Sequence, residues 1–339
     1  MKRLIELDYT KGFAILILLL SHCMGEENAL RTWISSWNMP IFFIICGLIH
    51  QLRNPDGLPL NKLKTWCKHR IIQIFIPYFI FSLLYIIFLN GLSWISEGKT
   101  NILNGCISVI TMHGIASMWF LPIYFFSEVL YTFLMIKLPR IIQILFIVIV
   151  ILSVTSLQHN NEIISTDKVI QLLLKISVGL SFVILGGMWS KYFIRAKIPI
   201  YFILISLLIS SITALYNGFI SIGALLLKNV VLFFLTGTIT SCIIIMLFKV
   251  INKRTNLKYL NILSTIGANS IVILVTNNLL IEIFRLLEYK VFNNFFLENG
   301  IIGAFLMTAI LIIPEYYLIS ISQSKIGILF GKKSNHQYN

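Results

Sequence analysis

Charged side chains are scarce in this sequence. Asp, Glu, Lys and Arg together make up only 12% of the 339 residues, whereas 58% of the residues are hydrophobic. A soluble domain of this length carries roughly twice that charged fraction. The scarcity of charge therefore excludes an ordinary soluble domain.

Paired cysteines and long polar segments are also lacking. The five cysteines show neither a disulfide framework nor the spacing of metal ligands, so we expect small packing residues and no metal site. They are Cys23, Cys46, Cys67, Cys106 and Cys242. No polar stretch is long enough to bury a core of its own. We therefore predict a single transmembrane domain over residues 1–322 and a short basic cytoplasmic tail over residues 323–339.

Long apolar runs are abundant instead. Stretches of about 20 apolar residues recur along the chain, and each is long enough to cross the hydrocarbon core as a helix. Their hydrophobicity neither alternates nor forms a single stripe, as expected for helices with apolar surroundings on most sides. We predict an all-α polytopic membrane protein with about ten transmembrane helices. The expected spans are 5–24, 34–52, 71–90, 118–136, 141–157, 169–190, 199–217, 223–248, 262–284 and 301–322.

The basic residues are distributed unevenly between the two sides of the membrane. If the N-terminus is cytoplasmic, 19 of the 27 Lys and Arg residues fall in cytoplasmic segments, five in outer segments and three inside spans. This is the positive-inside pattern, and it predicts an even number of spans with both termini in the cytoplasm. The net charge of +14 is therefore explained by the orientation of the chain in the membrane. It does not require a nucleic-acid partner, and we expect none. The Ile-, Lys- and Asn-rich composition favours a multi-pass protein of a bacterial inner membrane.

Residues 91–117 do not fit the pattern of spans. Their apolar part, from Ile102 to Ser117, is short. A further span here would invert the charge pattern of every later loop. We therefore expect a re-entrant or interfacial segment on the outer side.

Ionisable side chains inside the apolar runs are the strongest pointers to function, because each is costly in hydrocarbon. The first span holds Asp8, Lys11 and His22, and helical geometry places all three on one side. Asp8 can pair with Lys11 at i,i+3 spacing, and His22 lies about 16 Å from Lys11 along the axis. Glu128, in the middle of another span, must be paired or protonated. A structural alternative stays open. In it, the Lys11 side chain extends to the membrane–water interface, and His22 is a packing residue whose ring nitrogens are hydrogen-bonded.

Several segments together resemble the acyltransferase 3 family of integral membrane acyltransferases. The first span has a basic residue, ten intervening residues and then a histidine, and four further segments match family motifs in order. The matching segments are Lys11–His22, Met39–Leu48, Arg70–Tyr78, Trp119–Glu128 and Ile266–Ser270. Two positions depart from the pattern. Many relatives have a second basic residue where this chain has Gln73, and a histidine where it has Asn277.

The resemblance implies an O-acyltransferase that moves an acyl group from acyl-CoA to a sugar hydroxyl. The expected acyl group is acetyl, so the expected donor is acetyl-CoA. The expected partners are acyl-CoA as co-substrate, the lipid bilayer, and a surface glycan, exopolysaccharide, glycolipid or lipid-linked intermediate as acceptor. His22 would act as the general base, for which an ordinary pKa of about 6.5 is suited, or as a transient acyl carrier. Lys11 and Arg70 would bind the phosphates of CoA, although Lys11 could instead only neutralise Asp8.

The remaining candidate residues would serve the acceptor or support His22. Glu128 and Trp119 would orient His22 or form the acceptor pocket. Asp8, Asn269 and Asn277 are the other expected substrate-binding residues.

Two other functions stay open at this point. A secondary transporter also has ten or more spans and charges near the midplane of the membrane. A glycan polymerase or flippase would be polytopic and would handle sugars, but such proteins usually carry large outer loops or several intramembrane arginines, which we do not find.

Overall fold

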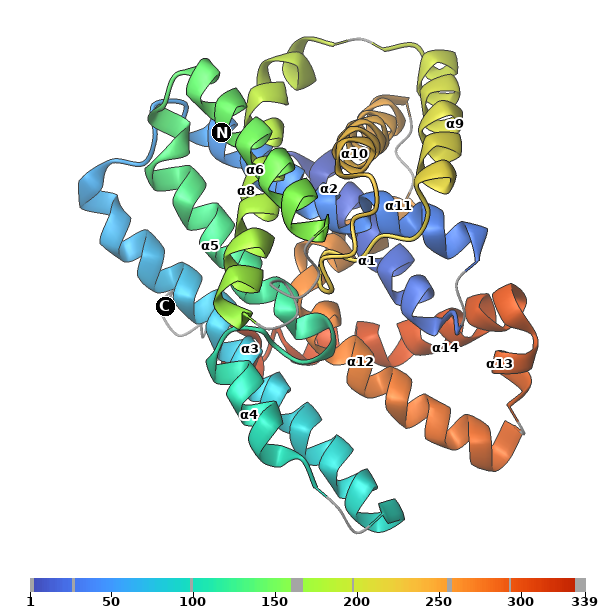
Figure 1. Ribbon diagram of the computed structural model, residues 1–339. Helices are drawn as coiled ribbons and strands as arrows, with labels where there is room; N and C mark the ends of the chain where they lie inside the picture. Colours follow the sequence, from blue (N-terminus) through green and yellow to red (C-terminus); the bar gives the residue numbers. More distant parts are fainter. Residues whose placement is uncertain are drawn as a thin grey trace. The chain divides into compact units, whose positions relative to one another are not determined.

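The computed structural model describes residues 3–25, 28–97, 100–159, 167–196, 198–254, 258–292 and 294–332 (Figure 1). Within these ranges the chain is helical, and the only β-type pairing is an isolated bridge between Ser221 and Leu226. The all-α prediction is therefore confirmed. Several residues that enter the charge bias or the predicted tail lie outside the described ranges. They are Lys2, Lys99, Lys197 and residues 333–339.

Nine helical segments of the described chain are long and apolar enough to cross a membrane. The tenth predicted span is α1 (Ile5–Cys23), which has 19 residues but also contains Glu6, Asp8 and Lys11. Two of these three charges are paired with each other, as described below, so that their cost in hydrocarbon is reduced. The chain is a multi-pass membrane protein, and the predicted number of about ten spans agrees with the structure.

The chain folds into two compact units. The first unit contains residues 1–18, 26–63 and 126–268, and the second contains residues 19–25, 64–125 and 269–339. Helix α1 begins in the first unit and ends in the second. Helix α5 (Phe120–Phe133) begins in the second unit and continues in the first.

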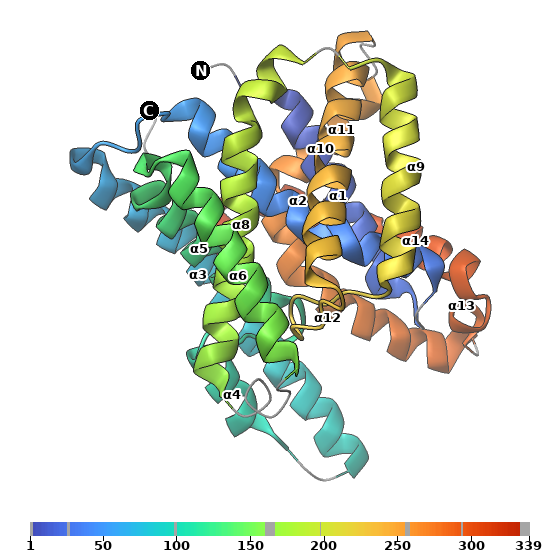
Figure 2. The same ribbon diagram turned by 45° about the horizontal axis from the view of Figure 1, so that its top comes forward.

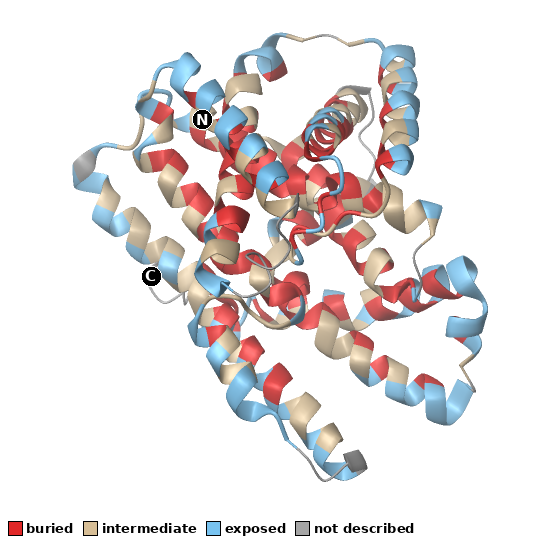
Figure 3. Cartoon of the chain, in the orientation of Figure 1, coloured by how far each residue is buried: buried red, intermediate tan, exposed pale blue. Residues whose placement is uncertain are grey.

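Helix α2 (Ala29–Arg53) forms the centre of the first unit. It packs against α8 (Lys168–Arg195), α9 (Ile200–Asn217) and α10 (Val230–Arg254), and most of its residues are buried (Figure 3). Helix α6 (Arg140–His159) packs on α8, and α9 runs beside α10 (Figure 2). The short helices η2 (Met135–Lys137) and α11 (Lys258–Ala268) complete the unit.

Glycines allow backbones in this unit to touch. A Cβ atom on Gly47 of α2 would lie 1.8 Å from the Val183 carbonyl oxygen of α8, and one on Gly186 of α8 would lie 2.1 Å from the Ile44 oxygen. Helices α1 and α11 meet in the same way. A Cβ atom on Gly12 of α1 would meet the Leu263 backbone of α11, and one on Gly267 of α11 would meet the Asp8 backbone of α1. Close approach at small residues is how helices associate in lipid, where there is no hydrophobic driving force between them.

The second unit is built around α3, α12 and α14. Helix α3 (Leu60–Glu97) is the longest, and α12 (Ser270–Leu287) packs on α14 (Gly300–Ile321). The shorter elements of this unit are α4 (Ile102–Ile110), η1 (Ala116–Trp119), η3 (Glu288–Phe292), α13 (Phe295–Glu298) and η4 (Lys325–Phe330). Helix α4 has nine residues and is too short to span a bilayer, as we expected for this part of 91–117.

Three of the predicted spans differ from the helices of the structure. Helix α3 extends the predicted span 71–90 at both ends and includes residues 91–97, which we expected to lie in the re-entrant segment. The run 223–248 begins as a helix only at Val230, because Asn217 and Asn229 close the preceding loop through two hydrogen bonds between side chain and backbone. The run 262–284 is broken at Asn269, which separates α11 from α12. Hydropathy alone reveals neither break, because the loop and the junction are themselves largely apolar.

Candidate functional site

A cation-rich cavity lies beside the first part of α1. The Asp8 carboxylate accepts from Lys11 Nζ at 2.8 Å and from Arg3 Nε at 2.6 Å. The i,i+3 pair predicted from the sequence is thus confirmed. The two cations fix Asp8 at the wall of the cavity, which has a volume of about 160 Å³.

Helix α2 supplies the other charged wall of this cavity. Arg53, at the end of α2, lines it together with Arg3, Asp8 and Lys11, and apolar side chains of both helices fill the rest. Three cations face one carboxylate, so the cavity carries a net positive charge. Such a site suits an anion, and arginine is the residue that binds phosphate in bidentate fashion.

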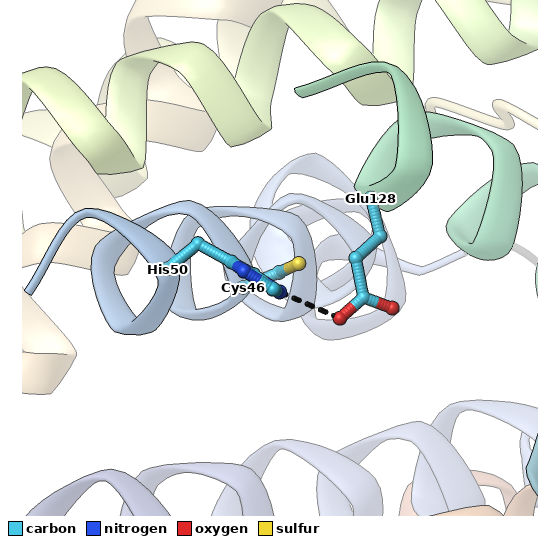
Figure 4. Close-up of side chains that lie close together, drawn as sticks. All are labelled: Cys46, His50 and Glu128. Carbon is cyan, nitrogen blue, oxygen red and sulfur yellow. Dashed lines mark hydrogen bonds and ion pairs between the residues drawn. The ribbon is translucent and has the colours of Figure 1, made fainter. Parts of the chain in front are cut away.

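Glu128 lies in a second polar cluster of the first unit, in which α5 meets α2 (Figure 4). Its Oε1 atom lies 2.7 Å from Nε2 of His50, and both side chains are buried. Thr132, one turn after Glu128, has its Oγ1 atom 3.3 Å from Nδ1 of His50. The prediction that Glu128 is paired or protonated is therefore confirmed, and the partner is His50.

The hydrogen-bond geometry fixes how the protons are arranged in this pair. The single hydroxyl proton of Thr132 is donated to the Glu128 carbonyl oxygen at 2.7 Å. Thr132 Oγ1 is then an acceptor for the Nδ1–H group of His50, and Nε2 faces the carboxylate. A bond of 2.7 Å between Nε2 and Oε1 requires one proton shared by His50 and Glu128. The pair is therefore neutral as a whole, as its burial demands.

His22 lies near the end of α1, within the second unit. Its backbone carbonyl oxygen accepts from Arg285 Nη2 of α12 at 3.3 Å, and Arg285 also contacts Glu282 at 3.4 Å. The Glu282–Arg285 pair follows the i,i+3 spacing seen in the sequence. Arg285 thus links the end of α1 to α12 and holds the backbone that carries His22.

Ser117, Asn277 and Asn278 form a polar cluster of the second unit. Ser117, two residues before Trp119 on η1, donates to the Leu274 carbonyl oxygen at 3.0 Å and lies 3.4 Å from Asn277 Oδ1. Asn278 Nδ2 donates to the same Ser117 hydroxyl. Asn277 is fully buried, whereas Trp119 is half-buried. Asn277 thus lies against η1, the short helix that ends at Trp119, and the roles predicted for both residues stay predictions.

Asn269 is held by the C-terminal segment of the chain. Lys332 Nζ donates to Asn269 Oδ1 at 2.5 Å and to Ser322 Oγ at 2.5 Å. Burial lowers the pKa of the Lys332 ammonium group. Phe330 of η4 packs against Phe81 of α3, with ring centroids 5.1 Å apart. The described part of the predicted tail thus packs within the second unit.

Arg70 lies on α3 and contacts Gln73, one of the two positions at which the sequence departs from the pattern it otherwise resembles. Its Nη1 atom donates to Gln73 Oε1 at 2.8 Å. Gly331, with a left-handed φ of 72°, lies against the backbone of Gln73. The neutral amide of Gln73 thus accepts a hydrogen bond from the Arg70 guanidinium group.

The predicted site residues therefore divide between the units. Asp8, Lys11 and Glu128 belong to the first unit, and Glu128 contacts His50 there. The other predicted site residues belong to the second unit. They are His22, Arg70, Trp119, Asn269 and Asn277. The predictions that Glu128 orients His22 and that Lys11 and Arg70 bind the phosphates of CoA stay predictions.

Sequence reasoning missed Cys46, His50 and Arg53. His50 lies inside the predicted span 34–52, so the argument applied to His22 and Glu128 would also have selected it. In the sequence, Arg53 is one of the basic residues of a cytoplasmic segment that determine the orientation of the chain in the membrane. Nothing in the sequence pairs His50 with Glu128, because 78 residues separate them.

The chain matches a known protein family. A model of a protein family described as an acyltransferase domain matches residues 4–319, nearly the whole chain. No curated protein and no solved structure matches the chain. The matched range contains α1 with Lys11 and His22, the α5 segment from Trp119 to Glu128, and the junction at Asn269. On this match, the chain belongs to the acyltransferase 3 family of membrane acyltransferases.

Proposed function

We propose that this membrane acyltransferase moves an acetyl group from cytoplasmic acetyl-CoA to a hydroxyl group of a sugar. The acceptor would be a surface glycan, an exopolysaccharide, a glycolipid or a lipid-linked intermediate. Family membership supports acyl transfer in general. The observation that supports acetyl-CoA as the donor is the cation-rich cavity lined by Arg3, Lys11 and Arg53. By the positive-inside pattern this end of α1 faces the cytoplasm, where acyl-CoA is available.

The cavity suits the phosphate-bearing end of CoA. CoA is a polyanion, and its phosphates need several cations to replace the water that they lose on binding. Arg53 can form a bidentate contact with a phosphate, whereas Lys11 acts as a point charge. The pairing of Asp8 with Lys11 and Arg3 holds these side chains before the ligand arrives. A preformed site of this kind lowers the ordering cost of binding.

His22 is the proposed general base. A sugar hydroxyl is a poor nucleophile at neutral pH, and a positioned base contributes about 10²–10⁴-fold. In the proposed step the hydroxyl oxygen attacks the thioester carbonyl carbon, while His22 accepts the hydroxyl proton. The C–O bond forms, the C–S bond breaks, and the proton passes to the sulfur of the departing CoA. The contact between Arg285 and the His22 carbonyl supports this role by restraining the backbone.

Ser117 and Asn277, which are in contact, and Trp119, two residues after Ser117 on η1, are the proposed acceptor-binding residues. Amide and hydroxyl groups match the hydroxyls of a sugar, and an indole face suits the apolar face of its ring. Buried polar groups that hydrogen-bond a substrate also reject analogues lacking the matching hydroxyl. Asn277 and Asn278 lie next to each other on α12, so both can take part in such selection.

Variants of the cavity test the donor part of the proposal. Lys11→Gln and Arg53→Gln are each expected to raise the KM for acetyl-CoA roughly tenfold, because each removes a charge-assisted contact worth about 1.5 kcal/mol. The matched donor is acetyl-pantetheine, which carries the same thioester but lacks the nucleotide and its phosphates. With this donor, the variants and the wild-type protein are expected to have similar KM values.

The comparison of donors separates a phosphate contact from a structural defect. A selective loss with acetyl-CoA supports the cavity as the donor site. An equal loss with both donors would contradict it. Solute movement across vesicles without any acyl donor would favour the transporter alternative instead.

A further inference from the structure

The cluster around Glu128 has a third member. Cys46 and His50 lie four residues apart on α2, so both side chains project from the same face of the helix. The Cys46 sulfur, one ring nitrogen of His50 and one carboxylate oxygen of Glu128 all lie within 4.8 Å of one another (Figure 4). All three residues are buried, with exposed fractions of 3%, 9% and 3%. All three also belong to the first unit.

The donor types are those that bind zinc. Thiolate, imidazole and carboxylate are its three common protein ligands, and a thiolate disfavours Mg²⁺ and Ca²⁺. Two ligands at i,i+4 on one helix and a third from a neighbouring helix form a compact set. Three protein ligands also leave a fourth tetrahedral position for water or a substrate atom.

The surroundings of His50 match those of a metal-bound imidazole. Such a histidine almost always donates its other N–H group to a nearby acceptor, which fixes the ring and the tautomer. Thr132 provides this acceptor at Nδ1, since its own proton is donated to the Glu128 carbonyl. Nε2 is therefore left to face the Glu128 carboxylate.

The charge balance is also favourable. A divalent cation bound by one thiolate, one carboxylate and a neutral imidazole gives a site of zero net charge, as a buried position requires. Binding would release the thiol proton and the proton shared by His50 and Glu128. Each zinc bond to nitrogen or oxygen is about 2.0–2.1 Å long, so in tetrahedral geometry Nε2 and Oε1 would move apart by roughly 0.6 Å.

We propose that Cys46, His50 and Glu128 bind a zinc-class divalent cation, which ties α2 to α5 within the first unit. The proposal replaces the expectation, drawn from cysteine spacing, that the chain has no metal site. That spacing carried no signal because the third ligand is remote in sequence. The proposal does not depend on the acceptor or the acyl donor.

Metal content tests the proposal directly. The full-length protein would be purified from cells grown with added zinc, through a tag without histidines and without chelators. Elemental analysis is expected to find about one zinc per chain. After replacement by Co²⁺, a thiolate-to-metal charge-transfer band is expected in the absorption spectrum, because Cys46 is a ligand.

Substitutions assign the site to these residues. Cys46→Ser and His50→Gln are expected to lower zinc occupancy at least about tenfold, and Cys46→Ser also abolishes the charge-transfer band. Thr132→Val, which removes only the acceptor at Nδ1, is expected to weaken zinc affinity about 10–100-fold. Cys242→Ser, a thiol on α10 of the same unit, is the matched control and should retain full occupancy.

Folding is followed separately by the elution profile of each variant in detergent. Loss of zinc in monodisperse Cys46→Ser or Thr132→Val protein supports the site even if His50→Gln does not fold. Wild-type protein without stoichiometric zinc and without a cobalt band would overturn the proposal. Unchanged occupancy in the Cys46→Ser variant would overturn it as well.

Discussion

Replacement of His22 by alanine is expected to lower the rate of acyl transfer by about 10²–10⁴-fold. The loss should appear in kcat, because the role proposed for His22 is on the acceptor hydroxyl and not on the phosphates of the donor. The KM for acetyl-CoA should therefore stay close to that of the wild-type protein. The measurement is a steady-state assay with labelled acetyl-CoA on protein reconstituted at equal amounts.

His113→Ala is the matched control for this prediction. His113 lies in the loop after α4, where its ring contacts Thr111, and it has no role in the proposed chemistry. It should retain wild-type activity. A His22→Ala variant that folds normally and transfers acetyl at the wild-type rate would remove His22 from the mechanism.

The same assay distinguishes a general base from an acyl carrier. Without acceptor, labelled acetyl-CoA should leave no label on the protein if His22 acts only as a base. If His22 carries the acyl group, label should accumulate on the wild-type chain and be absent from His22→Ala. The first outcome is the one we expect.

Adding a methyl group at Gly47 is expected to have the largest effect on stability. A Cβ atom there would lie 1.8 Å from the Val183 carbonyl oxygen, and that atom belongs to the backbone of α8. The helices must move apart, and the contact of Gly186 with Ile44 opens with them. We expect Gly47→Ala to lower the free energy of unfolding by about 3 kcal/mol, at the upper end for overpacked cores. Thermal unfolding in detergent measures the effect.

Gly91→Ala provides the control for helix propensity. Gly91 lies on α3, and a Cβ atom there would have no neighbour within 4 Å. Alanine has a higher helix propensity than glycine by up to about 1 kcal/mol, so this variant should be as stable as the wild-type protein or slightly more stable. Equal stability of Gly47→Ala and Gly91→Ala would mean that α2 and α8 do not touch at their glycines.

The amino-acid sequence predicts most of this fold because the bilayer restricts the choice. Backbone polar groups have no water to bind in hydrocarbon, so an apolar run of about 20 residues must be helical. The breaks were missed where a side chain closes a loop or a junction inside an apolar run. Asn217, which binds Asn229 across the loop before α10, is one such residue.

The candidate site was less predictable than the fold. The Asp8–Lys11 pair was found because both residues lie on one helix turn. The partner of Glu128 was not found, because only packing brings α5 against α2 and places His50 beside it. Arg53 lay at a predicted cytoplasmic end, where a basic residue has an orienting role that hides any other.

The central claim is that the protein transfers an acetyl group from acetyl-CoA to a sugar hydroxyl. The most direct test supplies isotope-labelled acetyl-CoA to membranes containing the wild-type protein, the His22→Ala variant or neither, followed by mass spectrometry of glycans and glycolipids. We predict a labelled acetyl group on a sugar with the wild-type protein alone. If no sugar carries the label while a solute or glycolipid crosses the membrane without acetyl-CoA, the acyl-transfer account is contradicted.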